Sequence, residues 1–351
     1  MPEEKIINKI IYSHTAIRGI AAVVVLFTHI NVFLRVDSAY FHLVDWGANA
    51  VDIFFVLSGF ILNYVYLSAG SPVPWAAYFT ARIARIVPLY YLTTISLLPF
   101  FCYKHSGAGD FLSILFKNLF LVSGITDGTS KTINFPAWSI GVEVFCYMLI
   151  FPLLVWLHAA FHQRRMYQPI MLILLAVCSV MLVSIYDFEG LSLRLVGADL
   201  SFLGRGIFGF IVGFSCCSLF RLNYNNHVLR SLANGAIIVA VIAFLLSRLG
   251  YLGLGIVYPA ILIIFFSAYD IGFVAHALKT RALQWLGERS YSIYLWHIPL
   301  MTYLGLLGLK QWALPTCLVY PAIIALVLLA ADLSYRFFET PSRTLIRKWT
   351  K

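Results

Sequence analysis

Long apolar runs recur along the whole of this chain, and they constrain its fold more than any other feature. Each run has roughly 18 or more residues with few charges, enough for a helix to cross a bilayer. Of the 351 residues, 61% are hydrophobic and 11% are charged, whereas soluble domains carry about 25% charged residues. No polar stretch is long enough for a separate soluble domain. The sequence therefore predicts an all-α, polytopic transmembrane bundle, with one domain over residues 1–351 and a core at about 13–340.

The apolar runs also predict the number and direction of the spans. Lys and Arg gather on the cytoplasmic side of membrane proteins. With the N-terminus placed there, 16 Lys and Arg fall on the same side and 8 on the other, with Arg18 at the inner mouth of the first span. This bias predicts an even number of spans and two cytoplasmic termini. Ten spans are expected, at about 17–34, 49–67, 87–103, 138–157, 168–186, 204–220, 231–248, 251–268, 290–308 and 316–336.

Four smaller features complete this outline. The apolar run from Phe111 to Val122 is too short to cross and is expected to be re-entrant or interfacial. The net charge of +10 follows from orientation-setting loops, so no nucleic-acid partner is predicted. The six cysteines form no C-x-x-C pair, and we interpret them as apolar fillers with no metal site. Gly209 and Gly213 form a G-x-x-x-G pattern, which favours close helix packing.

Histidines inside the spans are the first candidates for chemistry, because an ionisable group in the bilayer is costly and usually functional. Only His29 and His297, of nine histidines, fall well within spans. His29 shares its helix with Arg18, about 16 Å away along the axis and close to three turns on, so both project from one face. An anion bound at Arg18 would extend a long tail towards His29. The alternative is a snorkelling arginine and a histidine that hydrogen-bonds a neighbour.

Two carboxylates, Asp52 and Glu143, fall near the outer ends of the second and fourth spans. Because the second span runs antiparallel to the first, Asp52 is expected near the level of His29, where it would orient the imidazole and raise its basicity. The alternative for Asp52 is a helix-cap or dipole role. Glu143 is expected to be functional, or to pair with Arg205 at the outer start of the sixth span.

Arg82 and Arg85 are three residues apart and therefore share a helix face, within an aromatic-rich segment at 75–88. One interpretation is an interfacial amphipathic helix in contact with lipid headgroups. The other is a phosphate clamp, since two guanidiniums bind phosphate oxygens in a bidentate way. The residues alone leave both open.

A further group of side chains is expected to contact substrate or support the site. It consists of Trp138, Ser139, Arg205, Tyr294 and His297. On the predicted topology His297 lies in the cytoplasmic half, further in than His29.

An ion cluster is expected at the inner face, near the end of the chain. Its members are Asp332, Arg336 and Glu339, and its expected role is structural.

Five strings, taken in order, resemble the acyltransferase-3 family of bacterial integral membrane O-acyltransferases. The resemblance covers nearly the whole chain, and each string is weak alone but specific in combination. The strings are Arg18-x10-His29, Val51-Asp52-x-Phe54-Phe55-Val56-Leu57-Ser58-Gly59-Phe60, Arg82-x-x-Arg85-x-x-Pro88, Trp138-Ser139-x-x-x-Glu143 and Tyr291-Ser292-x-Tyr294-Leu295-Trp296-His297.

The resemblance implies transfer of an acyl group, usually acetyl, from cytoplasmic acyl-CoA to a hydroxyl of a sugar-containing acceptor, such as a surface polysaccharide or its lipid-linked precursor. Acyl-CoA is then a donor substrate, with no permanently bound cofactor. Arg18, Arg82 and Arg85 are expected to bind the CoA phosphates. His29 is expected to act as general base or as nucleophile, oriented by Asp52 or Glu143.

The same resemblance places the chain in the bacterial cytoplasmic (inner) membrane, as a member without an extra C-terminal extracytoplasmic domain. Its expected partners are the lipid bilayer, acyl-CoA and a glycan acceptor. A transporter or flippase of a lipid-linked sugar is the alternative. That alternative explains the spans and buried charges, but not basic residues clustered with a reachable histidine at one mouth.

Overall fold

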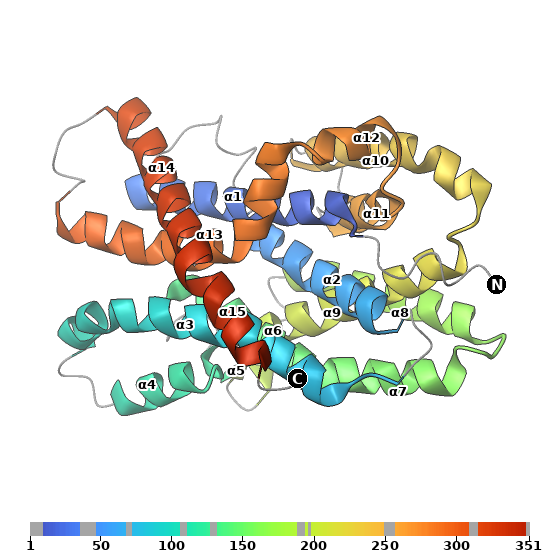
Figure 1. The fold of residues 1–351 in the computed structure, drawn as a ribbon, viewed down its shortest axis with the longest axis horizontal. Coiled ribbons are helices and arrows are strands. Elements are labelled where there is room, and N and C mark those ends of the chain that lie inside the picture. The colour runs from blue at the N-terminus through green and yellow to red at the C-terminus, as the bar shows by residue number, and fades with distance from the viewer. Residues whose placement is uncertain are drawn as a thin grey trace.

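The fold is a helical bundle, and the computed structural model describes residues 10–35, 47–67, 72–105, 111–126, 132–187, 194–195, 198–248, 257–308 and 315–348. Its elements are α1 (Tyr12–Leu34), α2 (Gly47–Tyr66), α3 (Trp75–His105), α4 (Phe111–Leu119), α5 (Ser123–Thr126), η3 (Phe135–Ala137), α6 (Trp138–Phe145), η4 (Cys146–Ile150), α7 (Phe151–Phe161), α8 (Tyr167–Asp187), β1 (Arg194–Leu195), β2 (Ala198–Asp199), α9 (Ser201–Leu222), α10 (His227–Arg248), α11 (Val257–Ser267), α12 (Gly272–Leu278), α13 (Arg281–Leu306), α14 (Thr316–Ser334), η6 (Tyr335–Glu339) and α15 (Thr340–Arg347). Figure 1 shows α14, η6 and α15 crossing the front of the bundle diagonally.

The predicted all-α transmembrane architecture is confirmed, with a different span count. Within the described ranges, eight helical segments are long and apolar enough to cross a membrane, or nine if α11 and α12 form one bent span. The bend between these two helices is 97°. The expected ninth span corresponds to α13, which is 26 residues long and lies outside that count because its first half is polar. The expected short segment is the nine-residue α4.

The third helix differs from its prediction. Instead of an interfacial helix followed by a separate span, α3 is one helix of 31 residues with Pro88 and Pro99 inside it. Arg82 and Arg85 are therefore fixed on the same rod as the membrane-spanning part. Their positions are set by packing within the bundle and not by a surface helix.

Two helices from opposite ends of the chain, α1 and α13, lie side by side and run parallel (Figure 1). The numbering offset between touching residues stays nearly constant along them. It is 272 where Gln284 donates to the carbonyl of Tyr12 at 2.9 Å and 268 for the contact of His297 with His29. Gly287 permits this close approach, because a Cβ there would lie 2.0 Å from the carbonyl oxygen of Thr15.

Close glycine contacts also join α2 and α9, the pair with the most extensive contact in the bundle. A Cβ on Gly213 would lie 1.8 Å from the Val56 carbonyl oxygen, and one on Gly59 would lie 2.0 Å from that of Phe210. The predicted close packing at Gly209 and Gly213 is thus confirmed, since small residues let membrane helices approach at the backbone.

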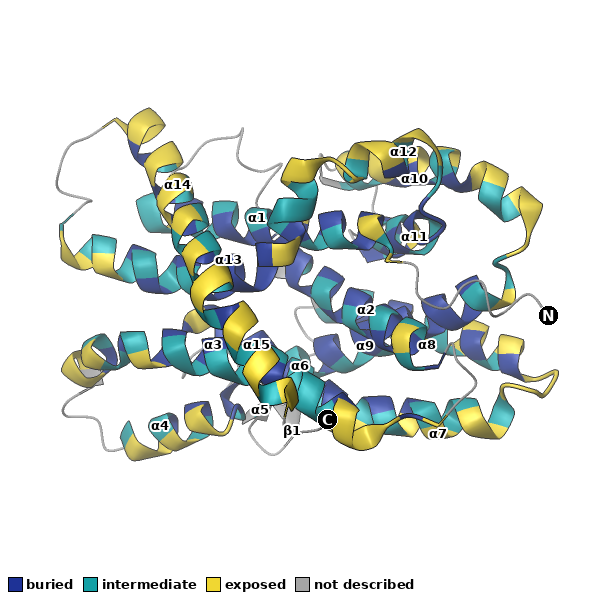
Figure 2. Cartoon of the chain, in the orientation of Figure 1, coloured by how far each residue is buried: buried dark blue, intermediate teal, exposed yellow. Residues whose placement is uncertain are grey.

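Burial separates the inner helices from the outer ones. In the apolar windows of these helices, 72% of the residues of α9 are buried but only 17% of those of α10 and 22% of those of α14. Figure 2 shows the same contrast, with α10 and α14 exposed along their outer faces. In a chain that spans a membrane, those apolar outer faces are the surfaces that meet lipid.

Two short π-helical segments interrupt the regular helices, and each ends two residues before a proline. The segment η4 precedes Pro152 and η6 precedes Pro341. A proline inside a helix lacks the N–H and clashes with the carbonyl four residues earlier, and a widened turn accommodates both. These turns set the orientation of nearby Tyr147 and Glu339.

Candidate active site

Two histidines face each other between α1 and α13. The His29 Nδ1 and His297 Nε2 atoms are 3.2 Å apart, and His29 Nδ1 also lies 2.9 Å from the carbonyl oxygen of Val25. A carbonyl only accepts, so this network assigns the hydrogen to His29 Nδ1 and the lone pair to its Nε2. His297 Nδ1 lies 3.3 Å from the Ile293 carbonyl, which by the same logic leaves its Nε2 as the acceptor towards His29.

The pair differs in burial. His297 is fully buried, whereas His29 is half-buried and has the ring of Phe135 5.7 Å away, edge-on. His29 therefore keeps an unprotonated ring nitrogen on the side away from His297. That nitrogen is suited to accept a proton or to attack a carbonyl carbon.

A cavity of about 40 Å³ lies where α1, α2, α3, α6 and α13 converge. Most of its polar lining carries hydroxyl or charged groups, and these residues are Arg18, Ser58, Arg85, Ser139, Glu143, Ser290, Tyr291 and Tyr294. A space of this size holds only a few water molecules. It is a polar pocket inside an otherwise apolar bundle.

The guanidiniums at this cavity make no ion pair within the described part of the chain. Arg18 and Arg85 line it, and neither has a hydrogen-bond or ion-pair partner among the described residues. Arg82 lies beside it, with its charge 5.6 Å from the centre of the Tyr147 ring and its Nε buried without a partner. Three guanidiniums thus lie at or beside a cavity whose described lining carries one carboxylate, that of Glu143. Because a desolvated charge is costly unless compensated, this excess of positive charge indicates a site for an anion.

Glu143 is the carboxylate in the lining of the cavity. Its Oε1 accepts a hydrogen bond from Ser58 Oγ at 2.6 Å and another from the hydroxyl of Tyr147. Its charge also interacts with that of Arg82. The expected pairing of Glu143 with Arg205 is wrong, since Glu143 is held by hydroxyls and Arg205 belongs to another pair.

Tyr294 connects the cavity to the histidines. Its hydroxyl lies 2.8 Å from Ser139 Oγ and donates to the Pro136 carbonyl at 2.9 Å. Its ring centre is 5.9 Å from that of His297. A residue that lines the cavity thus also packs against the supporting histidine, so the two parts of the site share a wall.

Asp52 forms a buried ion pair with Arg205, with Arg205 Nε 3.0 Å from Asp52 Oδ1. The guanidinium of Arg205 lies 5.2 Å from the centre of the Trp138 ring. The sequence predicted that Asp52 or Glu143 would orient His29, but the hydrogen-bonding partners of His29 are Val25 and His297. The pair instead joins α2 to α9, beside the close glycine contact.

The predicted depth of His297 is also wrong, because His297 lies level with His29. The cause is the start of the helix: α13 begins at Arg281, nine residues before the expected span. Polar residues in its first turns lower the hydropathy, which shifts the expected start inward. The sequence analysis did not single out Ser58 and Tyr291, which line the cavity. Both belong to the family-like strings, in which other residues were chosen as site candidates.

The acyltransferase domain family matches residues 11–336, and the chain belongs to this family, as its motifs predicted. YrhL of Bacillus subtilis (strain 168), named a candidate peptidoglycan O-acetyltransferase, is 26% identical over 364 residues, which cover 93% of this chain and 54% of that protein. The peptidoglycan O-acetyltransferase OatA of Listeria monocytogenes serovar 1/2a is 24% identical over 373 residues (96% and 56%). The O-acetyltransferase OatA of Staphylococcus aureus (strain NCTC 8325) is 25% identical over 342 residues (90% and 56%).

The chain spans about half the length of these curated relatives. No solved structure matches it significantly.

Proposed function

We propose that this protein is a membrane O-acyltransferase that moves an acyl group, in the first instance acetyl, from acyl-CoA to a hydroxyl of a glycan. One observation carries the proposal: guanidiniums without an ion pair among the described residues line a polar cavity, and a histidine with a free ring nitrogen lies further along α1. Guanidiniums would bind the phosphates of the donor, and the free ring nitrogen would meet its thioester.

The donor would bind with its phosphates at Arg18 and Arg85, which line the cavity, and with Arg82 close by. His29 is eleven residues beyond Arg18, about 16 Å along the helix axis. That distance suits an extended pantetheine arm, which would bring the thioester to the imidazole. A cavity of about 40 Å³ is too small for this arm, so donor entry requires the surrounding helices to move apart.

The chemistry would centre on Nε2 of His29. As a general base it takes the proton of the acceptor hydroxyl while the oxygen attacks the thioester carbon; the C–S bond breaks and the proton passes to the departing thiolate. As a nucleophile, Nε2 attacks the thioester carbon, and the C–S bond breaks to release the thiolate. The acceptor hydroxyl then attacks the acyl-imidazole, the N–C bond breaks, and the hydroxyl proton passes to the thiolate. In both routes His297 accepts from Nδ1–H and fixes the tautomer.

The two routes are separated by trapping. Brief exposure to labelled acetyl-CoA followed by rapid denaturation at neutral pH retains label on His29 in the covalent route. Absence of label during active turnover assigns the role of general base.

The acceptor proposed is a hydroxyl of a bacterial cell-wall or surface polysaccharide, or of its lipid-linked precursor. Two of the relatives are named as peptidoglycan O-acetyltransferases, which supports peptidoglycan as the first acceptor to test. The location proposed is the cytoplasmic membrane, with acyl-CoA entering from the cytoplasm and both termini on that side, as the distribution of basic residues predicts.

The deciding experiment follows labelled acetyl from acetyl-CoA into glycans on membranes that contain the protein. His29→Ala is expected to abolish transfer while membrane insertion is unchanged. Normal transfer by that variant would refute the site. Loss of glycan export without loss of acetylation would instead support the transporter alternative.

A further inference from the structure

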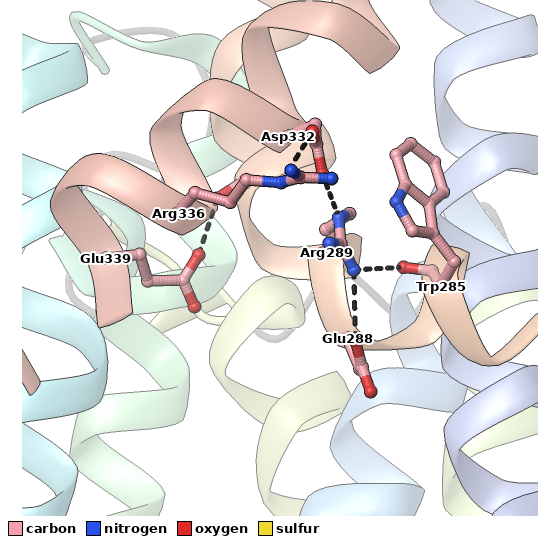
Figure 3. Close-up of polar contacts among 7 residues, drawn as sticks. Trp285, Glu288, Arg289, Asp332, Arg336 and Glu339 are labelled. Carbon is pink, nitrogen blue, oxygen red and sulfur yellow. Dashed lines mark hydrogen bonds and ion pairs between the residues drawn. The ribbon is translucent and has the colours of Figure 1, made fainter. Parts of the chain in front are cut away.

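An ion-pair network joins α13 to α14 and η6. Arg289 Nε lies 2.5 Å from Asp332 Oδ1, and Arg336 Nε lies 2.9 Å from Asp332 Oδ2. The Arg289 guanidinium is also sandwiched between the rings of Trp285 and Tyr335, each centred 4.6 Å away. Figure 3 shows Arg289 and Arg336 converging on Asp332, with Glu339 beyond Arg336. The predicted ion cluster is thus present for Asp332 and Arg336, and it fixes the start of η6. The prediction of Glu339 as its third member is wrong, because Glu339 pairs with Arg343.

The π-helical turn of η6 then places Glu339 in the interior, where only 2% of the residue is exposed. Glu339 Oε2 accepts a hydrogen bond from Ser292 Oγ at 2.5 Å, and Oε1 pairs with Arg343 on α15. Arg343 Nε is buried and makes no hydrogen bond. The guanidinium of Arg343 is therefore held by one carboxylate and has donor capacity left over.

Arg343 adjoins the cavity of the active site. Its guanidinium lies within electrostatic range of the Arg85 guanidinium and the Tyr291 hydroxyl, and both of these residues line the cavity. Helix α15, which carries Arg343, packs against α3, which carries Arg85. Two guanidiniums thus lie near each other in a largely desolvated place, with Glu339 as the carboxylate bonded to one of them.

We propose that Arg343 is a further donor-binding residue, which contacts a phosphate of the acyl donor next to Arg85, and that Glu339 is its counter-ion while the site is empty. This inference rests on the proposed function. Neighbouring guanidiniums repel until an anion lies between them, and a phosphate offers oxygens to both. Glu339 holds Arg343 in position until the phosphate binds its free donors.

The test compares two donors that carry the same thioester. Acetyl-CoA has phosphates and acetyl-pantetheine has none. For Arg343→Gln, KM for acetyl-CoA is expected to rise about tenfold or more, the usual cost of a lost charge-assisted hydrogen bond, with kcat unchanged. KM for acetyl-pantetheine is expected to stay the same. An equal rise for both donors would mean a structural role and would overturn the inference.

A second variant, Glu339→Gln, gives the opposite sign. Gln still accepts from Ser292 but no longer competes with phosphate, so KM for acetyl-CoA is expected to fall severalfold. If both variants raise KM, the counter-ion role is refuted. Arg347→Gln, an exposed position one turn further along α15, is the matched control and is expected to change neither KM.

The outcomes also separate this inference from the proposed function. Wild-type protein that fails to use acetyl-CoA would refute the proposed function itself. Wild-type protein that uses acetyl-CoA, with an unchanged KM in Arg343→Gln, would overturn only the role of Arg343.

Discussion

Gly287→Ala is expected to inactivate the protein although no catalytic side chain is altered. The added Cβ would lie 2.0 Å from the Thr15 carbonyl oxygen. Carbon and oxygen atoms that are not bonded stay at least about 3 Å apart, so α1 and α13 must separate by about 1 Å. The helices carry His29 and His297, whose ring nitrogens are 3.2 Å apart. A rigid shift of that size takes this contact to about 4.2 Å, beyond hydrogen-bond range.

Two magnitudes follow from this shift. Overpacking costs about 1–3 kcal/mol of stability, seen as a lower unfolding temperature in detergent. A misplacement of about 1 Å in a catalytic arrangement costs about 100-fold in rate, seen as lower kcat for labelled-acetyl transfer. The rate effect should therefore exceed what the loss of folded protein explains.

The chain offers matched controls. A Cβ on Gly235 meets no atom within 4 Å, and one on Gly305 meets only the Phe33 ring edge at 3.3 Å. Gly235→Ala is expected to keep full activity, and Gly305→Ala to lose little because the ring can move. Equal activity in Gly287→Ala and wild type, or equal damage from Gly235→Ala, would refute the reasoning.

Three further predictions concern the site. His297→Ala should lower kcat for acetyl transfer about 10- to 100-fold, because His29 keeps its bond to Val25 but loses its hydrogen-bonding neighbour. His297→Gln can place an acceptor oxygen near the lost nitrogen and should recover part of kcat. No recovery would count against a hydrogen-bonding role. Asp52→Ala should lower the free energy of unfolding by about 3–5 kcal/mol, since it removes one partner of a buried ion pair. The double variant with Arg205→Met should lose less; a larger loss in the double variant would contradict this. Arg85→Gln should raise KM for acetyl-CoA more than Arg82→Gln does, because Arg85 lines the cavity whereas the Arg82 guanidinium packs on the Tyr147 ring. A larger rise for Arg82→Gln would place the phosphates elsewhere.

Much of the fold was predictable because lipid imposes length and polarity on each span. The apolar runs predicted the helices, and the positions of Arg18 and His29 on one face followed from helical spacing alone. The errors arose where polar residues belong to a span. The predicted start of α13 is too late because Arg281, Glu288 and Arg289 mask a helix that continues through them.

The contacts within the site were less predictable, because spacing along one helix says nothing about its neighbour. Glu143 and Arg205 have opposite charges at similar expected depths, yet each has another partner. Glu143 is satisfied by Ser58 and Tyr147, hydroxyls that cause no visible interruption in an apolar run. Arg205 pairs with Asp52 because close glycine packing brings α2 against α9.

The parallel pairing of α1 with α13 has a consequence for biosynthesis. His29 is among the first residues to enter the membrane, and its partner His297 is made 268 residues later. At about 5–20 residues per second, that is a delay of roughly 15–50 s. Until then α1 lacks the surface that fixes its histidine. Until α13 is inserted, the nascent chain therefore lacks the paired histidines on which the proposed acyl transfer depends.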